Sequence, residues 1–358
     1  FKSSRLEPTL FVHPETKLTV IAYVDDLLFC GDDAACREFV VNIRKSLLSS
    51  EPQYLVHPGD KLRMLGRTLI RTHTGLIMQT NPAHVASIIE DLNARNRRRS
   101  TFPGRKLTSV EKSLLVKPLD SKRQSLYRSC VGRLIYASLD RPELAYVVKT
   151  LAGDIHSPTE ASWLQLDCVA RFLVDKESVI VSFQPNLRNG KVDGTVHGFC
   201  DADWAGSENR KSTSGGALVW NNVVLSHWSR TQSTYALSTC ESEFHSSVSC
   251  AQEGLYILGL LEEVGFTVKF HLHCDSSAAL GLMQKPGVSR PLRHLEVRFL
   301  FLQELLYEGK IKASKVPGTE NMSDLLTKFA TVAMLSSYLK EFRVVFVPLK
   351  EALRTEAI

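Results

Sequence analysis

The first apolar pattern of the chain is that of a β-hairpin. Residues 18–23 and 27–30 are apolar, and Asp25 and Asp26 lie between them. Short apolar runs separated by a polar break are typical of paired strands. The pattern therefore predicts a hairpin with two carboxylates at its tip.

Helical and extended patterns alternate in the next segment. Asp32 can cap a helix whose apolar side chains recur at helical spacing. Apolar runs over 62–70 and 76–78 predict a second hairpin. Asn81-Pro82 predicts the start of another helix, because proline is favoured at the first helical position.

A basic run follows this second helix. Arg95, Arg97, Arg98 and Arg99 precede Pro103-Gly104, which we interpret as a domain boundary. Two interpretations of the arginines stay open. They form a solvated linker, or they form an arm that contacts phosphate groups.

The remaining chain divides into a helical part and a part in which strands and helices alternate. Residues 105–177 have helical spacing, 179–183 predict a strand, and Asn189-Gly190 predicts a turn near a second boundary. From residue 196 on, the order is three strands, helix, strand, helices, strand and helix, which is a mixed α/β layer architecture. The expected strands are 196–201, 217–219, 223–226, 268–274 and 311–316, and the expected helices start at Ser238, Ser276, His294 and Ser323.

Composition indicates an ordinary globular protein. The 358 residues suffice for two or three domains, with 44% hydrophobic and 23% charged residues and a net charge of +6. This mild positive charge suits a polyanionic partner without proving one.

The eight cysteines include no C-x-x-C pair, which predicts reduced core thiols in an intracellular protein. The chain has no apolar run of the roughly 18 residues that a membrane span needs. Because it begins with Phe1, we expect an internal piece of a longer protein.

Four acidic residues in separate short motifs are the main candidates for chemistry. Asp201 and Asp275 each end an apolar, strand-like run, whereas Glu243 and Asp324 lie near predicted helix starts. If the two strands are adjacent, their carboxylates lie side by side, and helix N-termini favour further negative charge. Four carboxylates at one point cannot all stay ionised without cations. A pair of Mg²⁺ ions bound to oxygen ligands would serve phosphodiester cleavage.

Each of these residues also has an ordinary structural interpretation. A single acidic residue is more often a solvated surface residue than a ligand, and capping could explain Asp324. Asp203 shares a strand face with Asp201, so periodicity does not choose between them. His294 is more often a structural histidine than a proton shuttle.

Taken together, the motifs resemble the ribonuclease H domain of copia-type LTR retrotransposon polyproteins. Five of them occur in the family's order within about 130 residues. They are Cys200-Asp201-Ala202-Asp203-Trp204-Ala205-Gly206 with Arg210 to Gly215, Ser238 to Phe244, Cys274 to Ala279, Arg293 to Arg298 and Asp324 to Lys328.

The resemblance implies a function for these residues. Asp201, Glu243, Asp275 and Asp324 would bind two Mg²⁺ or Mn²⁺ ions, and His294 would assist turnover or product release. The family cleaves the RNA strand of RNA–DNA hybrids. Contacts to 2′-hydroxyl groups are the means of telling a hybrid from duplex DNA.

The upstream segment also resembles this family. Tyr23 to Asp26 is similar to the palm hairpin of reverse transcriptases, and Tyr127 to Tyr146 is similar to the connection. Asp25 and Asp26 would bind metal in an intact parent protein. The strand with the further aspartate and the fingers lie upstream in the family, so we expect no polymerase activity from this chain without that missing segment.

The resulting expectation is a C-terminal fragment of a copia-type Pol polyprotein. The fold class is mixed α/β, with a three-layer ribonuclease H-like domain (191–332) after a partial palm and thumb (1–103) and a helical connection (104–190), and with a tail (333–358). Its partners would be RNA–DNA hybrids and other nucleic acid, with no membrane, and it would be cytoplasmic in a virus-like particle or nuclear. The alternatives are an inactive remnant that binds nucleic acid through Arg95 to Arg99, and a structural protein with surface acids.

Overall fold

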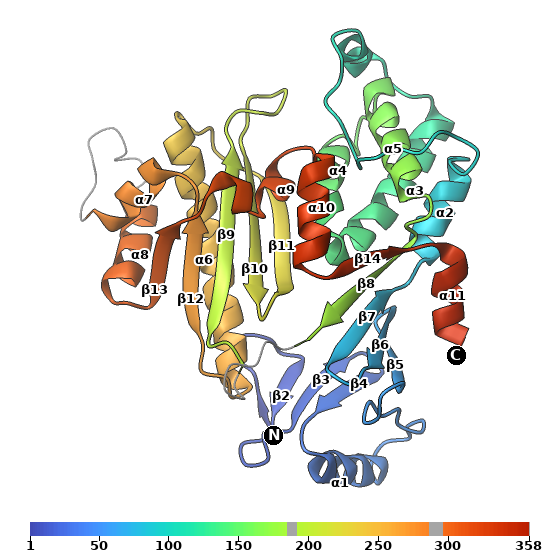
Figure 1. Ribbon diagram of the computed structural model, residues 1–358, viewed down its shortest axis with the longest axis vertical. Helices are drawn as coiled ribbons and strands as arrows, with labels where there is room; N and C mark the ends of the chain where they lie inside the picture. The colour runs from blue at the N-terminus through green and yellow to red at the C-terminus, as the bar shows by residue number, and fades with distance from the viewer. Residues whose placement is uncertain (185–191, 286–295, 358) are drawn as a thin grey trace.

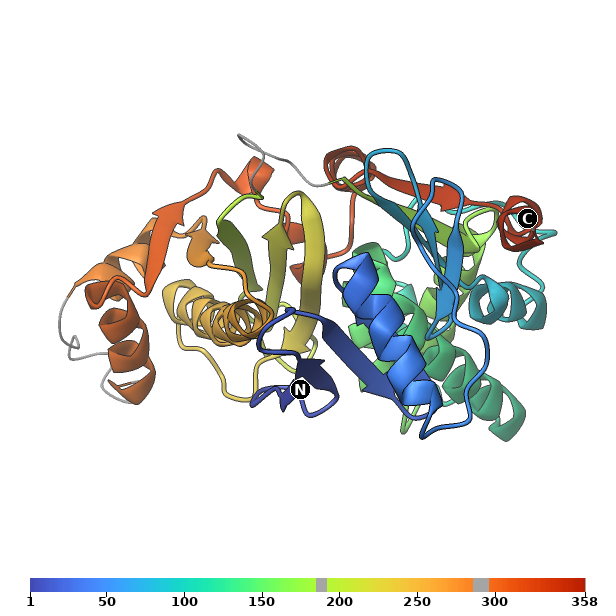
Figure 2. The ribbon, with the colours of Figure 1, turned by 90° about the horizontal axis from the view of Figure 1, so that it is seen from below.

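Helices and three β-sheets alternate along the protein, of which the computed structural model describes residues 1–184, 192–285 and 296–357. Figure 1 shows one sheet with its helices on one side of the molecule and a second sheet beneath a group of helices on the other. The smallest sheet, near the N-terminus, lies below both, and Figure 2 shows it from beneath.

The first sheet contains the predicted hairpin. Val24 and Asp25 form its two-residue turn, and Val24 has a φ of 51°, which is strained for a β-branched residue. The predicted cap of the following helix is confirmed, because the Asp32 carboxylate accepts a hydrogen bond from the Ala34 backbone N–H. The elements are β1 (Lys2–Ser3), β2 (Leu10–Val12), β3 (Thr19–Tyr23), β4 (Asp26–Cys30) and α1 (Asp33–Arg44).

The second sheet joins three distant parts of the chain in the order β14-β8-β7-β6-β5. The single strand predicted over 62–70 is wrong. Leu65 (φ 48°) and Gly66 (φ 72°) reverse the chain, and two consecutive positive φ values are what a tight hairpin turn requires. The strands are β5 (Lys61–Met64), β6 (Arg67–Arg71), β7 (Leu76–Thr80), β8 (Ser178–Phe183) and β14 (Val344–Val347).

Helices and the second sheet share one apolar core, which confirms the helical middle of the chain. Tyr127, Leu134, Leu144 and Phe172 are fully buried in it. The Tyr127 hydroxyl donates a hydrogen bond to the Leu151 carbonyl (2.8 Å), so its polar atom is satisfied. The elements are α2 (Ala83–Asp91), η1 (Glu111–Val116), α3 (Ser121–Ala137), η2 (Ser138–Asp140), α4 (Pro142–Gly153) and α5 (Glu160–Leu173).

The third sheet has the order β11-β10-β9-β12-β13 and is mixed. Strands β9, β10 and β11 are antiparallel, and β12 runs parallel to both β9 and β13. Asn221 (φ 51°) and Asn222 (φ 63°) make the turn between β10 and β11, in the gap between the strands predicted over 217–219 and 223–226. The elements are β9 (Thr195–Asp203), β10 (Thr213–Trp220), β11 (Val223–Thr231), α6 (Thr239–Glu263), β12 (Lys269–Cys274), α7 (Ser277–Gln284), α8 (Glu296–Tyr307), β13 (Ile311–Lys315), η4 (Gly318–Glu320) and α9 (Asp324–Thr327).

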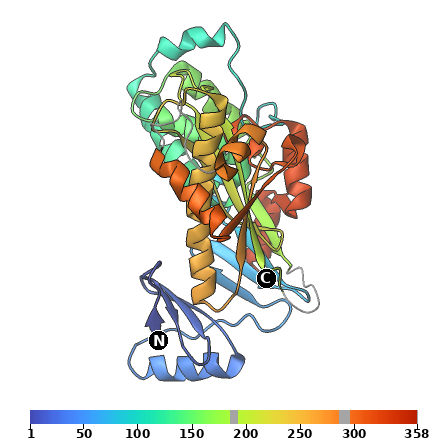
Figure 3. The ribbon, with the colours of Figure 1, turned by 90° about the vertical axis from the view of Figure 1, so that its left-hand side faces the viewer.

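Helices cover both faces of this sheet. The long helix α6, which Figure 3 shows running along the molecule, packs on the face formed by Val196, Cys200, Phe270, Leu272 and Cys274. The short α9 and α4 contact the other face at β9, β10 and β11. The mixed α/β fold and the three-layer domain are therefore confirmed.

The residues after 332 fold back onto the helical core. The helix predicted from Ser323 is a single turn, α9, and it is followed by α10 (Val332–Glu341), β14 and α11 (Leu349–Ala357). Strand β14 pairs antiparallel with β8, and Leu335, Tyr338 and Phe342 belong to the core around the helices. This segment completes the second sheet.

The arginines of the basic run are paired within the chain. Arg95 lies 2.8 Å from the fully buried Glu177 carboxylate, and Arg99 lies 3.2 Å from that of Asp175. Arg97 binds both carboxylate oxygens of Asp167. These pairs hold the run against α5 and the start of β8. They leave fewer free positive charges for a phosphate backbone than the sequence alone suggested.

Two further sequence predictions concern the cysteines and the membrane. All eight cysteines are free and six are buried, as predicted for core thiols. Among the helices of the described ranges, none combines the length and the apolar character needed to cross a bilayer.

Candidate metal centre

The first two predicted acids lie side by side at the ends of neighbouring parallel strands. Cys200 of β9 is paired in register with Cys274 of β12. Asp201 and Asp275 follow directly, and because side chains alternate along a strand, both point away from α6. Asp201 is buried, with 5% of its surface exposed.

The one-turn helix α9 brings a third acid, Asp324, to the same place. Asn321, in the preceding loop, donates a hydrogen bond to the Cys200 carbonyl (2.9 Å) and so fixes this loop to β9. Gly215, which pairs with Asp201 across β10 and β9, leaves the space that α9 occupies. A Cβ on Gly215 would lie 2.6 Å from Thr327 Cγ2, so a larger residue would force α9 away.

The fourth acid, Glu243, comes from the first turns of α6. Ser238, where the sequence predicted a helix start, caps this helix by accepting a hydrogen bond from the Glu241 N–H (3.1 Å). Glu243 is buried, with 8% exposed, and its Oε2 has no hydrogen-bond partner among the described residues. A buried, unpaired carboxylate oxygen is costly, and a bound cation is one partner that could satisfy it.

The structure brings all four predicted acids together. One oxygen each from Asp201, Asp275 and Asp324 lie within 4.8 Å of one another. Asp275 also belongs to a second group with Glu243 and the Cys274 thiol, again within 4.8 Å. Because the two groups share Asp275, they form one continuous centre.

Burial and mutual repulsion disfavour the charged carboxylates. Burial, together with the Asp324 charge, raises the pKa of Asp201 to about 6, although a hydrogen bond from Thr327 opposes this. Burial and then the charge of Asp201 raise the pKa of Glu243 to about 9. Burial and Asp324 also raise the pKa of Asp275. A divalent cation would reverse this balance, because it favours the ionised carboxylates.

Lys328 and Thr327 also belong to the centre, although the sequence did not identify them as functional residues. Lys328 Nζ lies 2.8 Å from Asp324 Oδ1. Burial opposes the charge of Lys328, but its bond to Asp324 and its attraction to Asp201 raise its pKa. The Thr327 hydroxyl donates a hydrogen bond to Asp201 Oδ2. The four-residue spacing of Asp324 and Lys328 on a predicted helix could have identified the ion pair.

Asp203, which periodicity could not separate from Asp201, has different neighbours. Burial raises its pKa, and three lysines, first Lys106 and then Lys328 and Lys149, oppose the shift. It belongs to none of the potential metal-binding groups found among the described residues. The geometry therefore favours Asp201 over Asp203 as the ligand.

The other predicted site residues lie elsewhere. Asp25 and Asp26 are exposed at the tip of the β3–β4 hairpin, and the described residues provide no third ligand close to them. His294 lies outside the described residues, so its role stays a prediction.

The four acids of the centre suit hard cations. Apart from Cys274, the donors are carboxylate oxygens, which Mg²⁺ and Mn²⁺ prefer. Such ions would give the unpaired Glu243 oxygen a partner. They would also lower the raised pKa values of Glu243 and Asp201, because they stabilise the ionised carboxylates. The arrangement therefore fits the ligand set of a divalent cation.

Proteins with similar sequences include polyproteins of plant transposons. The chain is 25% identical over 318 residues to the retrovirus-related Pol polyprotein from transposon TNT 1-94 of Nicotiana tabacum, covering 87% of this chain and 23% of that protein. It is also 25% identical over 357 residues to the retrovirus-related Pol polyprotein from transposon RE2 of Arabidopsis thaliana, covering 97% of this chain and 23% of that protein. Secreted RxLR effector protein 161 of Plasmopara viticola is 34% identical over 133 residues, 37% of this chain and 90% of that protein.

The chain thus spans 23% of the length of the two transposon polyproteins. Among solved structures, the ribonuclease H1 called LC11, isolated from compost, is 17% identical, with 37% of this chain and 93% of that chain covered and a TM-score of 0.31. No protein-family model matches the chain.

Proposed function

Because the chain belongs to the family of retrovirus-related Pol polyproteins of transposons, we propose that it hydrolyses the RNA strand of RNA–DNA hybrids with the help of divalent metal. The observation that carries the proposal is the meeting of Asp201, Glu243, Asp275 and Asp324 at one end of a mixed sheet. These are the acids that the sequence motifs single out. We assign the chain to the copia type on the same motifs.

The side chains of the centre have different proposed roles. Asp201, Asp275, Asp324 and Glu243 would hold two Mg²⁺ ions, which supply positive charge to the scissile phosphate and lower the pKa of the attacking water. Thr327 orients the Asp201 carboxylate through its hydroxyl group. The Lys328 ammonium balances the negative charge of Asp324. His294 would assist product release, as the resemblance implies.

The rest of the chain would be the end of the polymerase. We assign residues 1–103 to a partial palm and thumb, 104–190 to the connection and 191–332 to the nuclease domain. Asp25 and Asp26 would bind metal only with the upstream segment of the parent protein, because the described residues give them no third carboxylate. We therefore propose nuclease activity and no polymerase activity for this chain alone.

A cleavage assay tests the proposal directly. The full chain is incubated with Mg²⁺ and a hybrid whose RNA strand carries a fluorescent label, and the products are separated by size. We expect the RNA to be cut, and we expect Asp201→Asn and Asp275→Asn to reduce cleavage to background. EDTA should have the same effect.

Asp203→Asn is the matched control, since it removes a carboxylate from the same strand outside the metal-binding groups. It should retain cleavage. Loss of activity in Asp203→Asn with retention in Asp201→Asn would refute the site assignment. A wild-type chain that binds the hybrid without cutting it would favour the inactive remnant.

A further inference from the structure

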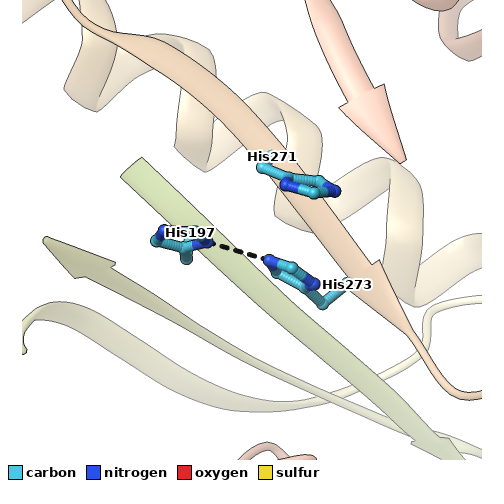
Figure 4. Close-up of side chains that lie close together, drawn as sticks. All are labelled: His197, His271 and His273. Atoms are coloured by element: carbon cyan, nitrogen blue, oxygen red, sulfur yellow. Dashed lines mark hydrogen bonds between the residues drawn. The ribbon is translucent and has the colours of Figure 1, made fainter. Parts of the chain in front are cut away.

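Three histidines lie on the same sheet face as Asp201 and precede the acids along β9 and β12. His197 of β9 is the register partner of His271 of β12, and His273 follows two residues later on the same face (Figure 4). One ring nitrogen from each of the three lies within 4.8 Å of the others. His271 and His273 are four and two residues before Asp275, which is about 13 Å and about 7 Å along an extended strand. Among the described residues, the histidine group shares no member with the two groups that contain the carboxylates.

The rings are oriented so that nitrogens face one another inside the cluster. His197 Nδ1 and His273 Nε2 are 2.9 Å apart, as the dashed line in Figure 4 marks. The outer nitrogens have oxygen neighbours: His197 Nε2 is 4.0 Å from Asp193 Oδ2, and His273 Nδ1 is 3.4 Å from Ser314 Oγ. In metal sites, the second nitrogen of a ligating histidine commonly faces a carboxylate or another acceptor.

Asp193 is itself held in place for this role. Its Oδ1 accepts a hydrogen bond from the Thr195 backbone N–H (3.1 Å), which leaves Oδ2 directed to His197. His273 is supported on its other side by Phe199, whose ring stacks on it with centroids 4.9 Å apart. Two of the three imidazoles thus have partners that fix their orientation.

A neutral imidazole ring offers one nitrogen lone pair to a cation, so each of the three histidines can supply one ligand atom.

We propose that His197, His271 and His273 form a binding site for a transition-metal ion, with Zn²⁺ as the preferred ion. This site is distinct from the acidic centre. Three histidine nitrogens with an open fourth position are the donor set of many zinc sites. Imidazoles favour zinc, whereas carboxylates favour Mg²⁺. The histidine cluster should therefore prefer Zn²⁺ to Mg²⁺.

Metal binding requires His197 and His273 to move slightly apart. With Zn–N bonds of about 2.0–2.1 Å, tetrahedral ligand nitrogens are roughly 3.3 Å apart, and His197 and His273 are at 2.9 Å. The proton between these two nitrogens moves to the outer nitrogen of the ring that carries it, which is His197 Nε2 facing Asp193 or His273 Nδ1 facing Ser314. Both rings therefore stay neutral. The ion would tie β9 to β12, the two strands that end in Asp201 and Asp275.

Zinc titration of the full, metal-stripped chain tests the proposal. Excess Mg²⁺ is present to occupy the carboxylates, and a chromogenic chelator competes for Zn²⁺. We expect one equivalent of tightly bound Zn²⁺ in the wild type and its loss in His197→Ala/His271→Ala. The control His57→Ala/His73→Ala removes two exposed histidines and should bind like the wild type, as should Asp201→Asn.

A second measurement covers the case in which the double variant does not fold. Cu²⁺ is added to the wild type and to His271→Asn, which keeps a polar side chain at this partly buried position, and electron paramagnetic resonance records the nitrogen couplings. We expect couplings from several imidazoles in the wild type and fewer in the variant. Equal zinc binding by wild type and double variant, no tight zinc binding at all, or identical copper spectra would each overturn the proposal.

Discussion

Glu243 is the side chain whose charge costs most in the metal-free centre. It is buried, its Oε2 has no partner in the described structure, and its pKa is raised to about 9 by burial and by Asp201. In the unfolded chain its pKa is near 4.5. The folded metal-free protein therefore keeps a proton on Glu243 that the unfolded chain loses as the pH rises.

This difference predicts how stability depends on pH. Because the folded state binds more protons, the free energy of unfolding of the metal-free protein should fall between about pH 4.5 and pH 9 and level off above. Asp201, whose pKa is raised to about 6, acts in the same direction at the lower end of this range. Glu243→Gln should flatten the slope, and Mg²⁺ should stabilise the wild type more at pH 8 than at pH 5.5.

Thermal unfolding across this pH range, with and without Mg²⁺, measures both effects. Glu262→Gln on the exposed side of the same helix is the control and should leave the slope unchanged. A Glu243→Gln variant with the wild-type slope would show that Glu243 is not the buried carboxyl described here.

Single positions also show what the sequence could establish about the site. The apolar runs before Asp201 and Asp275 placed both acids at strand ends, because that signal is local. The choice of Asp201 over Asp203 needed the position of α9 and of three lysines, which no local pattern encodes. The histidine cluster was missed, although His271 and His273 are two residues apart in a predicted strand and therefore share a face.

Among the elements, the single turn of α9 has the most direct effect on the site. It carries Asp324 and Thr327, and it reaches β9 only because Gly215 has no side chain. A Cβ there would lie 2.6 Å from Thr327 Cγ2 and 2.9 Å from Leu326 Cβ. These atoms belong to buried residues, so α9 would have to move.

Gly215→Ala should therefore impair catalysis more than folding. Overpacking of this kind costs about 1–3 kcal/mol of stability, and a displacement near 1 Å can reduce turnover by about 10²-fold. Hybrid cleavage and chemical denaturation measure the two effects. Gly132→Ala on α3, where a Cβ meets no atom within 4 Å, is the matched control and should retain both properties.

The elements differ in how well their sequences predict them. The turn at Asn221-Asn222 and the cap at Ser238 follow from residue types with strong local preferences. The reversal at Leu65-Gly66 was missed because leucine rarely adopts a positive φ. Strand β14 was missed because its partner β8 lies more than 150 residues earlier.

Over the full length of the protein, segments far apart in the sequence are joined by contacts that local sequence patterns do not predict. The second sheet joins β5–β7, β8 and β14. Beside it, Arg141 and Glu143 form a buried ion pair (2.7 Å), and the Arg141 guanidinium lies over the Phe346 ring of β14. Such long-range pairing depends on the complete fold, which is why the C-terminal segment was expected to be a tail.

The central claim is that the four acids hold divalent metal together, and a crystal structure with Mn²⁺ tests it most directly. Anomalous scattering locates the ions independently of any assumption about the ligands. We expect two peaks about 3.5–4 Å apart, contacted by Asp201, Glu243, Asp275 and Asp324. Electron density in which these four carboxylates bind no manganese, at a concentration that saturates the protein, would contradict it.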